Sequence, residues 1–208
     1  MRQSDLAMKN SCIGIAGYMG SGKTTLTRFL SEKRSYRIIH ADEEAKQVMV
    51  QNHTLHKKLQ DIFGFHIVKN GSLSFSILGS IVFNNVDKLR QLNTIVHPVL
   101  LAHLHKTIFK YRINGITILD GALLPFCNID DWFAIRIWID ASFNTRLKRQ
   151  LGKKLVLKEE EIKARMRMQE ELFPKPSIDT WSSFSNEGDH LSCFLSVLSS
   201  IEERMQNG

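Results

Sequence analysis

The sequence predicts an α/β fold in which helices flank a parallel β-sheet, and two observations support this prediction. Short apolar runs, which suit buried strands, alternate with longer stretches in which apolar residues recur every three or four positions. Strands separated by helices usually pair in parallel through right-handed crossovers, with helices on both faces of the sheet. A ligand of such a sheet binds beyond the carboxyl ends of its strands.

Four strands are predicted, each from a short apolar run. They cover residues 12–16, 37–40, 116–119 and 134–139. Aspartates follow three of these runs, at Asp42, Asp120 and Asp140. Because the carboxyl ends of parallel strands share one edge of the sheet, we expect the ligand site at this acidic edge.

Helices are predicted from the spacing of apolar residues and from capping residues. They cover residues 25–32, 144–151, 159–172 and 191–205, the last with Asp189 as its cap. The stretch 43–111 is predicted to be mostly helical, with interruptions at Asn70-Gly71 and at Pro98. The chain has no repeat or Gly/Ser linker, so we interpret this stretch as an insertion that carries part of a substrate site.

The composition is that of an ordinary globular domain. Of 208 residues, 43% are hydrophobic and 24% charged, which argues against intrinsic disorder. No run approaches the ~20 apolar residues of a membrane span, and residues 1–10 lack the apolar run of a secretory signal. Three cysteines, Cys12, Cys127 and Cys193, fit neither a disulfide framework nor a metal clip. We therefore expect a cytoplasmic protein with reduced thiols and no membrane partner.

The net charge of +7 comes largely from a basic stretch between Arg146 and Arg167. Such a stretch could contact nucleic acid, a membrane surface or a small polyphosphate, or it could be a solvated helix face. No aromatic residue lies between Phe143 and Phe173, so a stacking platform for single strands is disfavoured. We expect no nucleic-acid partner.

The most specific motif is a phosphate-binding loop between the first strand and the first helix. Residues 17–24 match the pattern G-x-x-x-x-G-K-[ST], whose glycines let backbone amides turn toward phosphate oxygens at a helix N-terminus. Lys23 can bridge the outer phosphates, and the Thr24 hydroxyl can bind Mg²⁺. A glycine-rich turn with a surface lysine is the alternative. The expected ATP-binding residues are Gly17, Gly20, Ser21, Gly22, Lys23, Thr24 and Thr25.

Switch GTPases, motor ATPases and small-molecule kinases share this loop. The chain contains no base-reading Asn-Lys-x-Asp tetrad, and it is short for a motor. A compact kinase needs an acceptor pocket, a carboxylate for the acceptor hydroxyl and a mobile basic lid. The candidate for the pocket is the insertion, the candidate for the carboxylate is Asp42, and the candidate for the lid is the stretch 146–153.

Taken together, these pieces resemble the dephospho-CoA kinase family. The resemblance runs in order over nearly the whole chain, from about Ile13 to the C-terminal helix. Its elements are the phosphate loop, His40-Ala41-Asp42 with Ala45, Phe63-Gly64, Asn70-Gly71-Ser72-Leu73, Ile81-Val82-Phe83, Leu92-Asn93-Thr94-Ile95-Val96-His97-Pro98, Asp120-Gly121-Ala122-Leu123-Leu124, Arg146-Leu147-Lys148-Arg149 and Gln169.

The resemblance implies transfer of the ATP γ-phosphoryl group to the ribose 3′-hydroxyl of dephospho-CoA, with Mg²⁺, as the last step of coenzyme A synthesis. It implies a P-loop kinase core over residues 12–208, preceded by an extension at 1–11. Within that core, residues 43–111 would be a helical CoA-binding insertion and residues 144–172 a lid region. The composition gives no oligomeric state.

Asp42, Arg146 and Arg149 are the catalytic candidates beside Lys23. The resemblance implies that Asp42 acts on the acceptor hydroxyl as base or orienting acceptor, while a helix N-cap for a segment beginning at Glu43 is the alternative. Arg146 and Arg149 lie one helical turn apart and could clamp the migrating phosphoryl group, or they could face solvent.

Asp120 and His97 are the remaining substrate-site candidates. Asp120 could hold a magnesium-bound water, or it could turn the chain before Gly121. His97 could contact substrate, or with Pro98 it could mark a helix start.

Several positions depart from the family pattern, among them the following three. His40 stands where the family usually has an acid, Lys153 stands in place of a lid arginine, and the acid expected near Phe126 is missing. Two alternatives to dephospho-CoA kinase therefore stay open. One is a kinase of another small metabolite or nucleotide, and the other is a degenerate ATP-binding protein.

Overall fold

The computed structural model describes residues 11–112, 115–153 and 157–206, which form two compact units. The first unit contains the chain up to His40 and again from Ile108 onward, and the second is Ala41–Thr107. The second unit covers nearly the same residues as the predicted insertion. Of the predicted extension 1–11, only Ser11 lies within the described residues.

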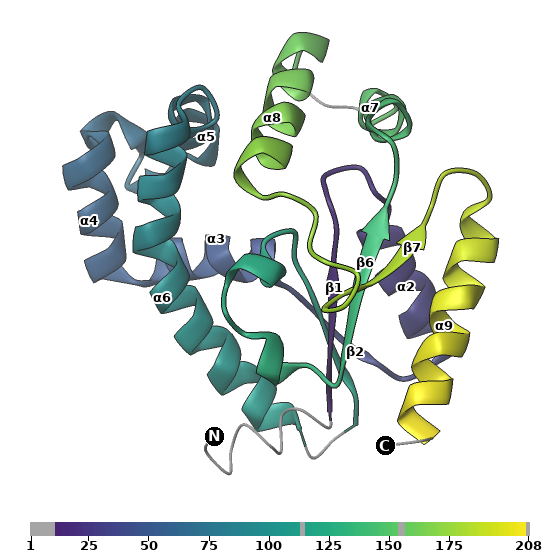
Figure 1. Cartoon of the computed structure of the whole chain (residues 1–208). Coiled ribbons are helices and arrows are strands. Elements are labelled where there is room, and N and C mark those ends of the chain that lie inside the picture. The colour runs from purple at the N-terminus through teal and green to yellow at the C-terminus, as the bar shows by residue number, and fades with distance from the viewer. Residues whose placement is uncertain (1–10, 113–114, 154–156, 207–208) are drawn as a thin grey trace. The chain divides into compact units, whose positions relative to one another are not determined.

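The first unit is built on a five-stranded sheet with the strand order β2-β5-β1-β6-β7 (Figure 1). The strands are β1 (Cys12–Ala16), β2 (Arg37–His40), β5 (Thr117–Asp120), β6 (Ile135–Asp140) and β7 (Ser182–Ser185). All four pairings are parallel, which confirms the predicted fold class. The central strand β1 is buried along its whole length, as expected for a strand covered on both faces.

Two long helices pack on the sheet of the first unit, α2 (Lys23–Lys33) and α9 (His190–Gln206) (Figure 1). Aliphatic side chains of the central strands meet their apolar stripes in one continuous core. Its fully buried members include Ile13, Ile15, Leu26, Leu30, Ile118, Ile137, Ile139, Val197 and Ile201. Removing such side chains from water supplies most of the stability of the unit. Asp189 caps α9 as predicted, accepting from the amides of Leu191 and Ser192.

The edge strand β7 was not predicted from the sequence. Its residues are mostly serine, and inward and outward positions alternate between half-buried and exposed. It therefore lacks the apolar run by which the other strands are recognised, and it exists because β6 offers it a parallel partner from Ile137 to Asp140. The helices α7 (Phe143–Leu151) and α8 (Glu159–Leu172) agree with the predicted ones.

The second unit is helical, with one short hairpin. Its elements are α3 (Ala41–Gln51), α4 (His53–Phe63), a 3₁₀ turn (Phe65–Ile67), β3 (Val68–Lys69), β4 (Ser72–Leu73), α5 (Phe75–Val82) and α6 (Val86–Tyr111), whose last residues belong to the first unit. The hairpin corrects the helical prediction for this segment. Asn70 and Gly71 both have positive φ, 52° and 77°, so the interruption noted in the sequence is a tight turn between paired strands.

Pro98 does not start a helix, which corrects one alternative for the His97-Pro98 pair. It lies inside α6, which continues through it from Val86 to Tyr111. An interior proline removes one backbone hydrogen bond and costs about 3 kcal/mol. Buried residues on both sides of it, among them Val96, Leu100 and Leu104, provide packing that offsets this cost.

Within the described ranges, no helix has the length and apolar character needed to cross a bilayer. The three cysteines are free thiols, with Cys12 and Cys193 buried and Cys127 half-buried. Burial raises the pKa of Cys12 to about 12 and that of Cys127 to about 11.

These raised pKa values predict slow alkylation of the native protein. At pH 8 only about 0.1% of Cys127 and less of Cys12 is thiolate, so iodoacetamide should modify both far more slowly than in guanidinium. Intact-mass measurement over time checks this, with the unfolded chain as control. Modification of native Cys12 at the unfolded rate would contradict it.

Candidate active site

The phosphate-binding loop (P-loop, residues 17–24) connects the end of β1 to the start of α2. Its three glycines have positive φ, 151° at Gly17, 84° at Gly20 and 103° at Gly22. A Cβ on Gly22 would lie 2.3 Å from Asn186 Nδ2, and one on Gly20 would lie 2.7 Å from the Arg146 carbonyl oxygen. The loop therefore needs glycine for backbone conformation and for the close approach of neighbouring residues.

Gly22→Ala should consequently distort the loop. The alanine would adopt a left-handed conformation that costs about 1–2 kcal/mol and would press on Asn186. We expect a lower melting temperature and loss of ATP-analogue binding, measured by calorimetry. Gly152→Ala is the matched control, because Gly152 has a right-handed helical φ of −70° and a Cβ there makes only ordinary contacts. Wild-type binding by Gly22→Ala would contradict this account.

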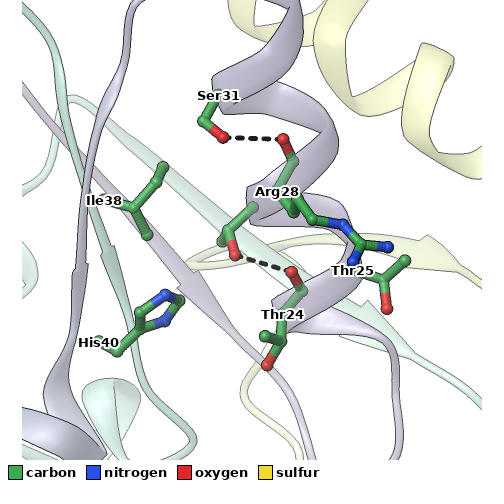
Figure 2. A pocket seen from close by; sticks show the side chains of 7 residues that line it. Thr24, Thr25, Arg28, Ser31, Ile38 and His40 are labelled. Atoms are coloured by element: carbon green, nitrogen blue, oxygen red, sulfur yellow. Dashed lines mark hydrogen bonds between the residues drawn. The ribbon is translucent and has the colours of Figure 1, made fainter.

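The ligand-binding groups of the loop lie at the N-terminus of α2. Lys23 Nζ donates to the carbonyl oxygens of Gly17 and Tyr18 at 2.8 and 3.2 Å, which holds the ammonium group over the loop. The side chains of Thr24 and Thr25 are exposed in the first turn (Figure 2). No acidic residue occupies this turn, so the positive end of the helix dipole is not neutralised there.

Ser21 differs from the other predicted ATP-binding residues. Its side chain is fully buried, and its hydroxyl has no hydrogen-bond partner among the described residues. Its amide donates to the Tyr18 carbonyl, while its own carbonyl accepts from Asn186 Nδ2 at 2.7 Å. The backbone of Ser21 thus holds the shape of the loop.

Arg146 and Arg149 of α7 both lie against the P-loop. The Arg146 side chain is only 1% exposed and forms an ion pair with Glu170, which excludes the solvent-facing alternative for this residue. Its Nε donates to the Ala141 carbonyl oxygen at 2.9 Å. Arg149 donates to the Gly20 and Ser21 carbonyl oxygens at 3.4 and 3.3 Å and to that of Asn186 at 2.7 Å. Both guanidinium groups therefore place positive charge next to the carbonyl oxygens of the loop.

The helix α8 also contacts the P-loop. The Met19 amide donates to Gln169 Oε1 at 2.8 Å, and Tyr18 Oη donates to the Phe173 carbonyl oxygen at 2.9 Å. Gln169 is part of the resemblance to the family, but no motif in the sequence gives it a role. The contact joins positions 150 residues apart, so no local pattern could have revealed it. Residues 154–156 of the predicted lid lie outside the described residues.

Asp120 ends β5 and pairs with His40 at the end of β2. The two residues are in register, and His40 Nδ1 lies 2.9 Å from Asp120 Oδ2. Asp120 is 6% exposed, and its Oδ1 has no hydrogen-bond partner within the described part of the chain. Its carboxylate is thus bonded to His40 rather than to the amides of a turn before Gly121.

A pocket of about 360 Å³ lies between α2 and β2 (Figure 2). It is lined by Thr24, Thr25, Thr27, Arg28, Ser31, Ile38 and His40. In Figure 2, Thr24 and His40 approach it from the helix and from the strand respectively. Hydroxyl groups and an imidazole next to the P-loop suit a polar, hydroxyl-bearing ligand.

Asp42 and His97 belong to the second unit. The helix α3 begins at Ala41, so Asp42 is an exposed residue of its first turn and not the N-cap of a segment beginning at Glu43. Glu44 in the same turn lies 2.6 Å from His103 Nε2 and so links α3 to α6. His97 is half-buried in α6, and desolvation lowers its pKa. Within the first unit, Arg146 and Arg149 contact the P-loop, and Asp120 bonds to His40, which lines the pocket beside that loop.

A parallel sheet and a complete phosphate loop with basic residues beside it define a P-loop nucleotide-binding protein. The same fold occurs in solved structures. A crystal structure of TT1252 from Thermus thermophilus has a TM-score of 0.71 at 24% identity and covers 94% of this chain and 97% of that one. Dephospho-CoA kinase from Campylobacter jejuni has a TM-score of 0.65 at 21% identity and covers 96% and 98%.

Sequence comparison narrows this class to one family. The family model for dephospho-CoA kinase (CoaE) matches residues 11–179. Dephospho-CoA kinase of Dehalococcoides mccartyi is 31% identical over 160 residues, which cover 76% of this chain and 79% of that protein. Dephospho-CoA kinase of Bacillus cereus is 31% identical over 166 residues, 78% and 82% of the two chains. The chain belongs to the dephospho-CoA kinase family.

Proposed function

We propose that this protein transfers the γ-phosphoryl group of ATP to the ribose 3′-hydroxyl of dephospho-CoA and so makes coenzyme A. The observation that carries the proposal is the family match over residues 11–179, which includes an intact P-loop. Phosphoryl transfer is catalysed mainly by positioning and by charge stabilisation. The chain offers groups for both.

The P-loop binds the ATP phosphates in this proposal. The N-terminus of α2 faces the anion, and Lys23 moves from its loop carbonyls onto the outer phosphates. Arg149 contributes positive charge from its position against the Gly20 and Ser21 carbonyl oxygens. Arg146, buried against Glu170 and Met19, supports the loop and is expected to act through its position.

The oxygen donors in the first unit fit Mg²⁺. Thr24 exposes a hydroxyl at the start of α2, and Asp120 has a buried carboxylate oxygen with no partner among the described residues. Such hard oxygen ligands suit this cation, which usually retains several waters. Thr24 would bind it directly and Asp120 through water, and when bound it would neutralise charge on the β- and γ-phosphoryl oxygens.

Asp42 is the proposed base or orienting group for the acceptor hydroxyl. It follows the last residue of β2 by two positions in the chain, and ligands of this fold class bind beyond the carboxyl ends of the strands. Residues 43–111, with His97, would bind the rest of dephospho-CoA, and the described parts of 144–172 would act as the lid.

The free thiols suit a reducing compartment, and we propose the cytoplasm.

We propose no nucleic-acid partner. Two residues of the basic stretch are in ion pairs, Arg146 with Glu170 and Lys163 with Glu159 and Glu160. These pairs lower the positive charge that the stretch offers to duplex phosphates.

The acceptor is tested by ADP release over a panel of hydroxyl compounds. With Mg·ATP, dephospho-CoA should stimulate ADP release well above nucleosides, nucleotides and sugars supplied at equal concentration. If another acceptor stimulates ADP release and dephospho-CoA does not, the protein is a kinase of that other acceptor. Binding of an ATP analogue without stimulation by any acceptor would favour a degenerate ATP-binding protein.

A further inference from the structure

The pairing of His40 with Asp120 is a feature that the proposed reaction does not yet use. The two residues are opposite each other in neighbouring parallel strands, so their side chains project from the same face of the sheet. His40 Nδ1 and Asp120 Oδ2 are 2.9 Å apart, and the Asp120 side chain is 7% exposed. This is a close polar contact at the carboxyl edge of the sheet.

The direction of this hydrogen bond depends on the tautomer of the imidazole. An ionised carboxylate has only acceptors, and with such a partner Nδ1 of His40 carries the proton and donates the hydrogen bond to Oδ2. A bond to an ionised acceptor is stronger than a neutral one, and it orients both planar groups. The rotation of the Asp120 carboxylate is therefore set by His40.

The second oxygen of Asp120 is then held in one direction. Oδ1 is buried and has no hydrogen-bond partner among the described residues. A buried carboxylate oxygen without a partner is costly, and such atoms commonly bind water or a ligand. His40 also lines the pocket together with Thr24 and Thr25, so the imidazole links Asp120 to the side of the P-loop where Thr24 exposes its hydroxyl (Figure 2).

We propose that His40 is a positioning residue for Mg·ATP, because its Nδ1–H bond to Oδ2 orients Asp120 so that Oδ1 can accept from a magnesium-bound water. The inference rests on the proposed use of Mg·ATP but not on the identity of the acceptor. Removing a partner that orients a metal site commonly weakens metal affinity by about 10–100-fold. The same range is expected when His40 loses its donor.

Two substitutions separate the donor from the rest of the ring. His40→Leu removes the donor, and His40→Asn retains an N–H donor near the position of Nδ1. Ser196→Ala is the control, because the Ser196 hydroxyl is exposed on α9 and donates to the Ser192 carbonyl oxygen of that helix. Calorimetry with a non-hydrolysable ATP analogue at several Mg²⁺ concentrations measures the metal dependence without turnover.

We expect His40→Leu to need about 10–100-fold more Mg²⁺ for half-maximal effect on analogue binding, with unchanged binding in the absence of Mg²⁺. His40→Asn should recover most of this loss, and Ser196→Ala should match the wild type. An unchanged Mg²⁺ requirement in His40→Leu would overturn the proposal. If that variant instead raises only the KM for dephospho-CoA, His40 contacts the acceptor and the positioning role is wrong.

A measurement on the wild type covers the case in which His40→Leu does not fold. Nitrogen-15 NMR of the imidazole should show a proton on Nδ1 of His40, and the signal should shift in Asp120→Asn. A neutral ring protonated only on Nε2 would overturn the proposal, because Nδ1 could not then donate to Asp120. Neither the Mg²⁺ titration with the ATP analogue nor the NMR measurement requires dephospho-CoA, so a wrong acceptor would leave both results interpretable.

Discussion

Lys23→Ala should lower kcat by at least about 10³-fold, because the developing charge on the transferred phosphoryl group loses its main cationic partner. Coupled-enzyme measurement of ADP release under saturating Mg·ATP and dephospho-CoA gives the rate. The ammonium group also bonds to the carbonyl oxygens of Gly17 and Tyr18, so a thermal melt must show that the variant is folded.

Lys33→Ala is the matched control for this substitution. Lys33 lies at the other end of α2, is exposed and contacts the ring of Phe29. It removes the same charge from the same helix but far from the P-loop. We expect near wild-type turnover in Lys33→Ala. Equal turnover in Lys23→Ala and the wild type would contradict the assignment of the loop.

Asp42→Asn should reduce kcat by about 10²–10⁴-fold, the usual range for loss of a general base, and leave ATP-analogue affinity unchanged. The amide is nearly isosteric with the carboxylate but cannot accept the hydroxyl proton. Single-turnover rates and calorimetric titration of the analogue measure the two quantities separately.

Glu43→Gln provides the comparison for Asp42→Asn. Glu43 is the next residue in the first turn of α3 and is also exposed, so both substitutions remove one charge from the same helix N-terminus. A purely structural role of Asp42 would give similar, small effects in both variants. A parallel loss of ATP affinity in Asp42→Asn would assign it to nucleotide binding.

Features encoded by neighbouring residues were predictable from the sequence. The P-loop is one, because glycine spacing and a following Lys-Thr pair are a local requirement of phosphate binding. The strand ends at Asp120 and Asp140 are another, since each ends a buried apolar run. Four of the five strands of the sheet were found in this way.

Features that depend on distant partners were not predictable. The strand β7 needs β6 beside it, and the buried position of Arg146 depends on Glu170 of another helix. The contact of Gln169 with the P-loop and that of His40 with Asp120 link residues 150 and 80 positions apart. The interruption predicted at Pro98 does not occur, because tertiary packing holds α6 together across a residue that breaks isolated helices.

The reaction product tests the central claim most directly. The protein, Mg·ATP and dephospho-CoA are incubated, and the product is analysed by mass spectrometry and by phosphorus NMR. The account predicts coenzyme A, with the new phosphate on the ribose 3′-oxygen, and its absence in Lys23→Ala. A folded, ATP-binding protein that yields no coenzyme A, or that phosphorylates a different hydroxyl, would contradict it.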